Sequence, residues 1–574
     1  MSATVSGRRQ RPALGMPVST PELVSALALI ATVILVVVPL GFLVYSSLLT
    51  AAPGSPQAHL TAANWRLVLN PHGRTAILNT LQLGAYVTVF ALILGSFFAW
   101  IASRADVPLI RPLSVLLVLP MLLSPLLTTL AWTVLASPRS GLINAAFHHL
   151  VPGTDPLLNV YSLAGMVVIM TLYFTPFAYL VMLGAVQGVD TSFEDASRVA
   201  GAGVGTTLRR ITLPVVTPAL ISAGLLIFAL ACEQLAVPTL LGLQAKLPTL
   251  QYEIYLSMLD SPSNPNYAAA AGCFLLLITV AGILLYSRMV GVSRRFVTIS
   301  GKATAAKRVS LGAWRFVALA VVLLYLFVAV VAPYAALILG SLLKYVTPNL
   351  SPDILTTNNY RELLRAPSTV TALRNTLVYS AVGASAAVAF SLLLGYMTVR
   401  RTTRMAPFIE FFAMLPLSVP AISLGLGILY ASLAVPIGVY GTVWILGIAY
   451  LTRFSPQGIR TLSASLIQVD PELELASRVA GASWLTTIRR ITLPLVRPAL
   501  LAAWTLLFVQ ISLEISMTIL LYTPKTATAA LNIWFAYFGG DATLAYSMAV
   551  IMATLSFAAI FFGQRFAGLL SHVR

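Results

Sequence analysis

The chain has 574 residues, of which 58% are hydrophobic and 9% are charged, whereas a soluble domain carries about 25% charged residues. This composition, with a mean hydropathy of +0.90, excludes an ordinary soluble enzyme, a disordered chain and a fibrous protein, and it predicts an integral membrane protein. The 35 Lys and Arg against 17 Asp and Glu are typical of membrane proteins with basic cytoplasmic loops, so we expect no nucleic-acid partner.

The N-terminal apolar run follows the basic residues Arg8, Arg9 and Arg11. It is longer than the roughly 7–15 residues of a signal-peptide core, so we expect an uncleaved first span. A membrane-crossing helix needs about 20 mostly apolar residues. The stretches that meet this length predict an all-α polytopic protein with about twelve spans in two sets of six: 24–49, 78–102, 113–136, 161–187, 215–237 and 267–288, then 314–343, 373–398, 408–432, 437–459, 498–521 and 545–569.

The distribution of Lys and Arg predicts the orientation of the chain. With a cytoplasmic N-terminus, 25 of these residues fall in cytoplasmic segments and 9 in external ones, so we expect both termini in the cytoplasm. The basic, polar stretch around 293–313 is interpreted as a cytoplasmic linker. It divides the chain into an N-terminal half, 1–292, and a C-terminal half, 314–574.

An internal repeat supports this division. Residues 194–220 and 474–500 are identical at 20 of 27 positions, at an offset of 280. A shorter pair, Asn79-Thr80-Leu81 and Asn375-Thr376-Leu377, opens the second span of each half. Both copies of the long match lie between the fourth and fifth spans, so the repeat is parallel, unlike the inverted repeats of many secondary transporters.

The repeated segment has the features of a short cytoplasmic helix joined to a membrane span. Acidic residues open the helix, where they suit the helix dipole, and Gly201 or Gly481 can end it or turn the chain. Pro214 and Pro494 fit the first turn of the next membrane helix. We therefore predict an element that receives a push from a cytoplasmic partner; the alternative is a duplicated loop kept for folding alone.

The segment resembles the EAA loop of type I ATP-binding-cassette importer permeases, which reads E-A-A, three residues, G, nine residues, I-x-L-P. The first glutamate is Asp195 in one copy and Leu475 in the other, and Glu194 and Glu474, one residue earlier, are candidates to substitute for it. The resemblance implies two ATPase-coupling loops, 190–214 and 470–494, with these site residues: Glu194, Asp195, Ala196, Gly201, Ile211, Leu213 and Pro214, and Glu474, Leu475, Ala476, Gly481, Ile491, Leu493 and Pro494.

The resemblance covers essentially the whole chain and implies a type I importer permease of two homologous six-helix halves in a bacterial inner membrane. Its implied partners are two copies of a cytoplasmic ATP-binding subunit and one external, periplasmic substrate-binding protein. A fused double permease resembles the group that imports ferric iron, thiamine, polyamines or aminophosphonates. Residues 237–242 and 520–524 look most like the ferric-iron branch, so ferric iron is the expected cargo and the other three are alternatives.

No enzyme chemistry is predicted for this chain. Gly301-Lys302-Ala303 lacks the first glycine and the hydroxyl of a P-loop, so ATP hydrolysis belongs to a partner. We expect no catalytic or cofactor-binding residues, and the five histidines lack zinc-ligand spacing, so no metal site is expected. An ion-coupled secondary transporter is the alternative from another class; it would need ionisable residues at the membrane midplane and broken helices.

Two acids in or near apolar spans, Glu233 and Glu514, are the candidate residues of a translocation path. They lie 19 residues after Pro214 and 20 after Pro494, roughly 30 Å along a helix and close to the outer surface. A charge at the bilayer centre costs at least about 2.5–3.5 kcal/mol, so such residues usually face a bundle interior or a cavity. Two interpretations stay open: carboxylates lining a path for a cation, or interfacial acids that are paired or exposed to water.

Overall fold

A computed structural model of the chain describes residues 20–293, 309–401, 403–436 and 438–571. The basic N-terminal flank and linker residues 294–308 lie outside this description. Apart from three isolated β-bridges, the regular structure of the described residues is helical.

The helices of the first half are α1 (Thr20–Ser47), α2 (Ala63–Val68), α3 (Pro71–Arg104), α4 (Ile110–Leu116), η1 (Leu119–Leu122), α5 (Pro125–Ala136), α6 (Leu142–Leu150), α7 (Leu163–Gln187), α8 (Thr191–Val199), α9 (Val204–Thr207), η2 (Leu208–Thr212), α10 (Leu213–Cys232), α11 (Ala236–Ala245), α12 (Leu250–Leu259) and α13 (Pro265–Ser293). Those of the second half are α14 (Trp314–Leu326), η4 (Phe327–Val331), α15 (Ala332–Ser341), η5 (Pro352–Ile354), α16 (Asn358–Arg365), α17 (Pro367–Val399), α18 (Ala406–Met414), η6 (Leu415–Ser418), α19 (Ala421–Ala434), α20 (Val443–Gln468), α21 (Pro471–Val479), α22 (Trp484–Thr487), η7 (Ile488–Thr492), α23 (Leu493–Ser512), α24 (Thr518–Leu521), α25 (Ala529–Phe538) and α26 (Ala542–Ser571).

A helix lies at each of the twelve predicted span positions. Among the described residues, nine helices are long and apolar enough to cross a membrane, or eleven if each of two bent pairs is one span. The bends, of 95° before α5 and 110° before α19, fall at prolines, which remove a backbone hydrogen bond and break the helix. The remaining position is α20, which has 26 residues but contains Arg453 and Arg460 and is less apolar than the others.

The repeat seen in the sequence is also a repeat of structure. The elements α7, α8, α9, η2 and α10 each have a counterpart that begins 280 residues later, from α20 to α23. The loop of the repeat therefore connects a long helix to a long helix in the same way in both halves.

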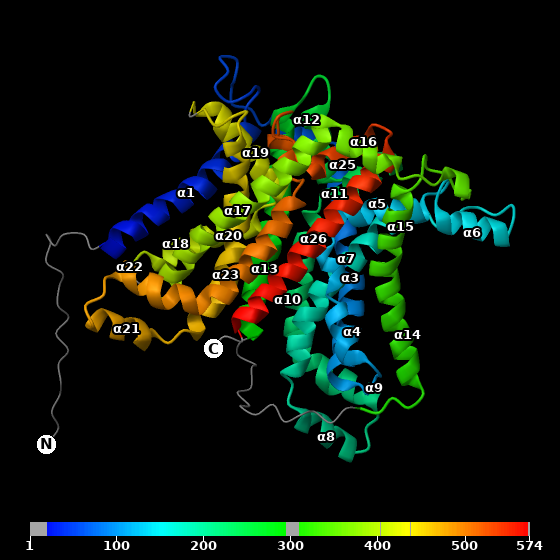
Figure 1. Cartoon of the computed structure of the whole chain (residues 1–574), viewed down its shortest axis with the longest axis horizontal. Helices are drawn as coiled ribbons and strands as arrows, with labels where there is room; N and C mark the ends of the chain where they lie inside the picture. Colours follow the sequence, from blue (N-terminus) through cyan, green and yellow to red (C-terminus); the bar gives the residue numbers. More distant parts are fainter. Residues whose placement is uncertain (1–19, 294–308, 402, 437, 572–574) are drawn as a thin grey trace.

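The first helix of each half packs on the other half. The helix α1 lies along α18 and α19 of the second half, and α15 of the second half packs on α5 of the first (Figure 1). The hydroxyl of Tyr325 on α14 donates to the carbonyl of Leu172 on α7 at 3.0 Å. The two halves therefore exchange their outer helices rather than lying side by side as separate bundles.

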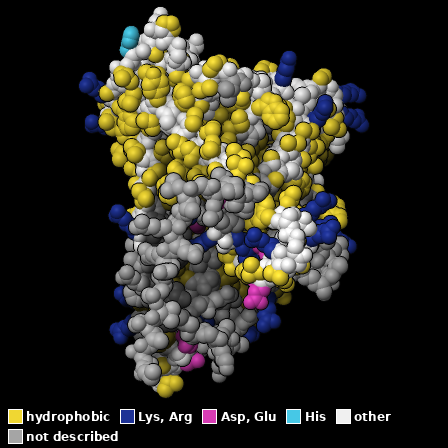
Figure 2. All heavy atoms as spheres, turned by 90° about the vertical axis from the view of Figure 1, so that its left-hand side faces the viewer, with side chains coloured by type: hydrophobic (Ala, Val, Ile, Leu, Met, Phe, Trp, Pro, Cys, Tyr) yellow, Lys and Arg dark blue, Asp and Glu magenta, His cyan; other side chains and the backbone are white. Residues whose placement is uncertain are grey.

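Large apolar side chains are exposed on the outer surface of the molecule. Figure 2 shows hydrophobic side chains in a broad belt on the face that α1 occupies, with Lys and Arg toward its margins. On α1, Leu27, Ile30 and Ile34 are more than half exposed. Such a belt would be unfavourable in water and is stable in the hydrocarbon core of a bilayer.

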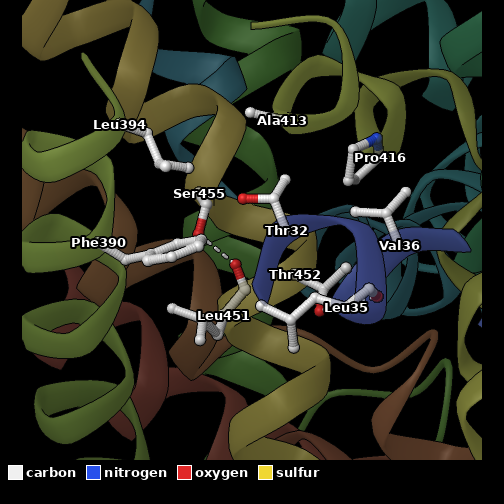
Figure 3. A pocket seen from close by; sticks show the side chains of 10 residues that line it. All are labelled: Thr32, Leu35, Val36, Phe390, Leu394, Ala413, Pro416, Leu451, Thr452 and Ser455. Atoms are coloured by element: carbon white, nitrogen blue, oxygen red, sulfur yellow. Dashed lines mark hydrogen bonds between the residues drawn. The ribbon is translucent and has the colours of Figure 1, made fainter. Parts of the chain in front are cut away.

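A small cavity of about 10 Å³ lies between α1 and the second half (Figure 3). Thr32 and Val36 of α1 face Phe390 of α17 and Pro416 of η6 across it. The hydroxyl of Ser455 donates to the carbonyl of Leu451 at its wall (Figure 3). The cavity has room for about one water molecule, so it is a packing gap and not a cargo site.

Candidate functional site

The two predicted coupling loops form short helices beyond the ends of the spans. The helices α8 and α21 lie at the lower end of the molecule in Figure 1, opposite α12 at the upper end. Gly201 and Gly481 follow them with φ of +81° and +87°, a backbone conformation that costs glycine little. The predicted turn at these glycines is thus confirmed.

The Ile-x-Leu-Pro part of each loop belongs to the next membrane helix rather than to the short helix. A π-turn, η2 or η7, runs without a break into α10 or α23. Proline lacks an N–H and its ring clashes with the carbonyl four residues earlier, and a π-turn widens the backbone there. The helix therefore begins at Val204 or Trp484, ten residues before the proline that was expected to open it.

In the first loop, Glu194 points into its own half of the protein. It is 4% exposed and accepts a hydrogen bond of 3.0 Å from the hydroxyl of Thr212 in the π-turn. Arg104, at the end of α3, brings its Nε to 3.4 Å from the other carboxylate oxygen. The guanidinium of Arg104 also donates to the carbonyls of Val186 and Val189 at 3.0 and 2.8 Å.

In the second loop, Glu474 makes the same contacts with more partners. It is 7% exposed and accepts from the hydroxyl of Thr492 at 3.0 Å. Arg400, after the end of α17, donates from Nε and Nη2 at 3.2 and 3.1 Å. The hydroxyl of Tyr396 adds a hydrogen bond of 2.9 Å. The structure therefore buries both glutamates against their own halves, away from the solvent-facing side of α8 and α21.

The solvent-facing side of the two short helices is largely apolar. Val199 and Val479 are 91% and 88% exposed, and Phe193 and Leu475 are 53% and 57% exposed. Asp195, Ala196 and Ala476 are also on the exposed side. Exposed apolar patches on a protein surface are typical of protein–protein contacts.

Each short helix has an acidic residue at its N-terminal end. Asp190 accepts a hydrogen bond of 2.9 Å from the backbone N–H of Ser192, and this bond holds the pKa of the Asp190 carboxyl below its usual value. Asp470 accepts likewise from the N–H of Glu472 at 2.9 Å. Charged caps at this end satisfy free backbone N–H groups and suit the helix dipole.

The candidate path residue Glu233 forms an ion pair between the two halves. It directly follows α10, and its Oε1 lies 2.6 Å from Nη2 of Arg453 on α20, with side chains 14% and 13% exposed. Arg453 also donates to the carbonyls of Pro416 and Val419, at 2.9 and 2.8 Å, where the bent pair of α18 and α19 is broken.

Glu514 lies close to the same arginine. It follows the end of α23 and caps α24, accepting from the N–H groups of Met517 and Thr518 at 2.8 and 3.0 Å. Arg453 acts on it electrostatically, as it does on Glu233. An arginine within an apolar run is visible in the sequence and signals a functional position, but the sequence does not indicate its partners.

The repeat does not duplicate this charge cluster of Glu233, Arg453 and Glu514. The positions 280 residues away hold Leu513, Tyr173 and Gln234 respectively. The cluster is therefore specific to the contact between these two halves.

The comparisons with known proteins agree with one another on the kind of protein. The sequence model of the family described as "Binding-protein-dependent transport system inner membrane component" matches residues 89–299 and again 366–572. A ferric transport system permease protein of Actinobacillus pleuropneumoniae, FbpB, is 27% identical over 490 residues, covering 85% of this chain and 70% of that protein. A putative ferric transport system permease protein of Haemophilus influenzae, FbpB 1, is 28% identical over 78% of this chain and 70% of its own.

Other similarities cover about one half of the chain. The molybdenum transport system permease protein ModB of Mycobacterium tuberculosis is 30% identical over 38% of this chain and 80% of its own length. The solved structure of a bacterial alginate ABC transporter in complex with an alginate pentasaccharide-bound periplasmic protein is similar at 17% identity, with a TM-score of 0.35, over 44% of this chain and 92% of that one.

Proposed function

The chain belongs to the family of binding-protein-dependent transport system inner membrane components, and from this premise we propose that it carries ferric iron across the membrane for an ATP-driven importer. The chain is a multi-pass inner membrane protein with two permease domains of the type I importer fold, and it is the permease of an ABC importer rather than an enzyme. Membership of this family also argues against an ion-coupled secondary transporter.

The proposed machinery consists of this chain, two copies of a cytoplasmic ATP-binding subunit and one periplasmic substrate-binding protein. The halves 1–292 and 314–574, joined by the linker 293–313, would each receive one ATP-binding subunit on the exposed apolar side of α8 or α21. This arrangement requires both chain termini in the cytoplasm, as the Lys and Arg distribution predicts. Closure of the ATPase dimer would then move the fifth spans and switch access from one side of the membrane to the other.

The proposed path runs between the halves, past the charge cluster of Glu233, Arg453 and Glu514. Two carboxylates against one guanidinium leave this cluster with a net negative charge when all three are ionised, which suits a cationic cargo. Arg453 ties α10 of the first half to α20 of the second, so it would hold the path closed in the arrangement seen here. Opening the path would separate this pair.

The names of relatives support ferric iron as the cargo. Two relatives that match most of this chain are named as ferric transport permeases. A second candidate, an oxyanion of molybdenum, has the support of the 30% identity of one half to a molybdenum permease. The acidic cluster favours the cation over the oxyanion because like charges repel in a desolvated path.

The experiment is a deletion of the gene for this chain in its native host, followed by uptake of radiolabelled ferric iron and, in parallel, of molybdate, spermidine, thiamine and an aminophosphonate. We expect ferric iron uptake alone to fall, and the intact chain to restore it. Unchanged iron uptake with loss of another label would replace ferric iron by that cargo. No change for any label would contradict the proposed import.

The same strain tests the coupling role of the two glycines. The double substitution Gly201→Val and Gly481→Val forces a β-branched residue into a left-handed backbone conformation, although a Cβ meets no neighbour at either position. We expect normal membrane insertion and ATP hydrolysis without uptake. The control is Gly205→Val, at a glycine with equal space and without the positive φ. Full uptake by the double variant would refute the coupling role.

A further inference from the structure

We propose that one buried ion pair in each half fixes the coupling loop to the second span of that half. A push on the loop then moves α3 together with α10 in the first half, and α17 together with α23 in the second half. The proposal rests on the proposed coupling function of the loops. The first brace consists of Arg104, Glu194 and Thr212, and the second brace of Arg400, Glu474 and Thr492. Each joins three elements: the end of a long span, the short coupling helix and the π-turn that leads into the next span.

The two braces share their geometry, although the sequence offset between the halves is not the same for all of their residues. Glu194 and Glu474 are 280 positions apart, as are Thr212 and Thr492, whereas Arg104 and Arg400 are 296 apart. The segment between the arginine and the glutamate thus differs in length by 16 residues between the halves. The contact nevertheless forms in both, with the threonine bond at 3.0 Å each time. Because segments of unequal length form the same contact in both halves, the contact is a property of the shared fold and not of one loop.

The π-turn supplies the third member of each brace. A proline two residues later widens the helix at Thr212 and Thr492, and both hydroxyls are buried on the glutamate. The Ile-Thr-Leu-Pro sequence therefore links the coupling helix to the fifth span through a side chain as well as through the backbone.

Burial makes each brace stiff. Glu194 and Arg104 have side chains that are 6% and 4% exposed, and Glu474 and Arg400 are 9% and 11% exposed. Separating such a pair would leave a desolvated charge without a partner, which is far less favourable than separating an exposed pair. The loop and the end of the second span therefore move as one body.

The two braces differ in strength. Arg400 holds Glu474 with two nitrogens and Tyr396 adds a third donor. In the first half the position of Tyr396 is Trp100, and a cavity of about 10 Å³ lies beside Glu194. We infer that the second brace transmits movement more tightly than the first.

The end of α3 that carries the first brace also contacts the segment that leads into α14. The N–H of Val309 donates to the carbonyl of Arg104 at 2.7 Å, and the N–H of Leu311 donates to Asp106 at 2.9 Å. That hydrogen bond holds the pKa of the Asp106 carboxyl below its usual value. A push on α8 is thus carried through Arg104 to the start of α14, the exchanged first helix of the second half.

The test uses the complete complex, with its ATPase subunits and its ferric-iron-loaded binding protein, in proteoliposomes. The variants are Glu474→Gln and Glu194→Gln, and the control is Glu410→Gln, an exposed acid on α18 that lies outside both coupling loops. The readouts are iron transported per ATP hydrolysed and the amount of ATPase subunit that copurifies.

We expect Glu474→Gln to lower iron transported per ATP by roughly tenfold, within the usual range of coupling between distant sites, with ATPase binding unchanged. Glu194→Gln should have a smaller effect and Glu410→Gln none. Normal transport per ATP by Glu474→Gln overturns the proposal. Loss of the copurifying ATPase also overturns it, since Glu474 would then be a contact with that subunit.

A second variant separates coupling from simple instability. In Glu474→Gln with Arg400→Gln no buried charge is left unpaired, so thermal stability should return toward that of the unaltered complex while transport per ATP stays low. Recovery of both thermal stability and transport per ATP would assign the pair a folding role only. If the unaltered complex fails to transport iron, the proposed cargo is wrong, and the brace is then tested by the variant-to-unaltered ratio of ATPase stimulation by the binding protein.

Discussion

Arg453 illustrates how a single charge is accommodated inside an apolar helix. It lies ten residues into α20, about 15 Å along a helix of about 39 Å. An unpaired charge at that depth is costly. Its guanidinium is satisfied by Glu233 and by the carbonyls of Pro416 and Val419 at the break before α19. The bend and the arginine therefore compensate each other.

Neutralising one member of this ion pair should destabilise the protein more than neutralising both. We expect Arg453→Gln to lower the free energy of unfolding by about 3–5 kcal/mol, because Glu233 loses its cationic partner. The double variant Glu233→Gln with Arg453→Gln should recover much of this loss. Thermal unfolding in detergent measures both. Additive losses in the double variant would contradict a direct pair.

Single residues were predictable from the sequence where their chemistry is local. Gly201 and Gly481 follow from their place after a short helix, and the backbone is left-handed at both. The burial of Glu194 was not predictable, because its partner Arg104 is 90 positions away. A single sequence contains no signal that pairs two such distant residues. Arg453 was visible as a charge in a span, but its partners come from three separate segments.

At the scale of elements, the short Asn-Thr repeat proves to hold a helix in place. The hydroxyl of Thr80 on α3 accepts from the first N–H of α12, that of Leu250, at 2.9 Å. Thr376 on α17 accepts from Ala529, the first residue of α25, at 2.8 Å. The preceding asparagines donate to carbonyls just before the same helices. Each half thus anchors a short helix on its second span.

Removing this hydroxyl should loosen the anchored helix. We expect Thr80→Val to lower the free energy of unfolding by about 1–3 kcal/mol, the usual loss when a buried N–H loses its acceptor. Thr376→Val should act alike in the second half. Thr88→Val is the control, since its hydroxyl donates within α3 to Gly84. Chemical or thermal unfolding measures the difference, and equal losses for Thr80→Val and Thr88→Val would refute the anchoring role.

The sequence predicted where long helices occur better than what lies between them. Every predicted span position holds a helix because a long apolar run has few other stable structures in lipid. Segments 238–266 and 522–544 fall between predicted spans. They contain α11, α12 and α25, and the residues of α11 from Ala236 to Gly242 are buried. Runs of about ten apolar residues are too short to identify by length as spans.

At the scale of the whole molecule, the exchanged helix α1 fits closely against α19. A Cβ on Gly427 would lie 2.3 Å from the carbonyl oxygen of Pro39, so glycine is needed for this approach of two backbones. No periodicity in the sequence indicates which half a helix will contact, and the exchange was therefore not predicted.

Adding one methyl group should separate the two helices. We expect Gly427→Ala to cost about 1–3 kcal/mol, as overpacking usually does. Gly447→Ala, at a helical glycine of α20 with open space around it, should be neutral or slightly stabilising. Melting temperatures of the purified protein test this. Equal melting temperatures for the two variants would show that α1 can move away without loss.

The exchange of first helices has a consequence for synthesis of the chain. Ser47 ends α1 and Ala406 begins α18, 359 positions later, so at about 5–20 residues per second α1 waits some 20–70 s for that partner to emerge from the ribosome. During that interval the side of α1 that carries Val36 faces lipid, although it is 2% exposed in the finished fold. The part of the permease that was inserted first is therefore enclosed only after most of the chain has been made, and a chain interrupted midway leaves that helix without its partner in the second half.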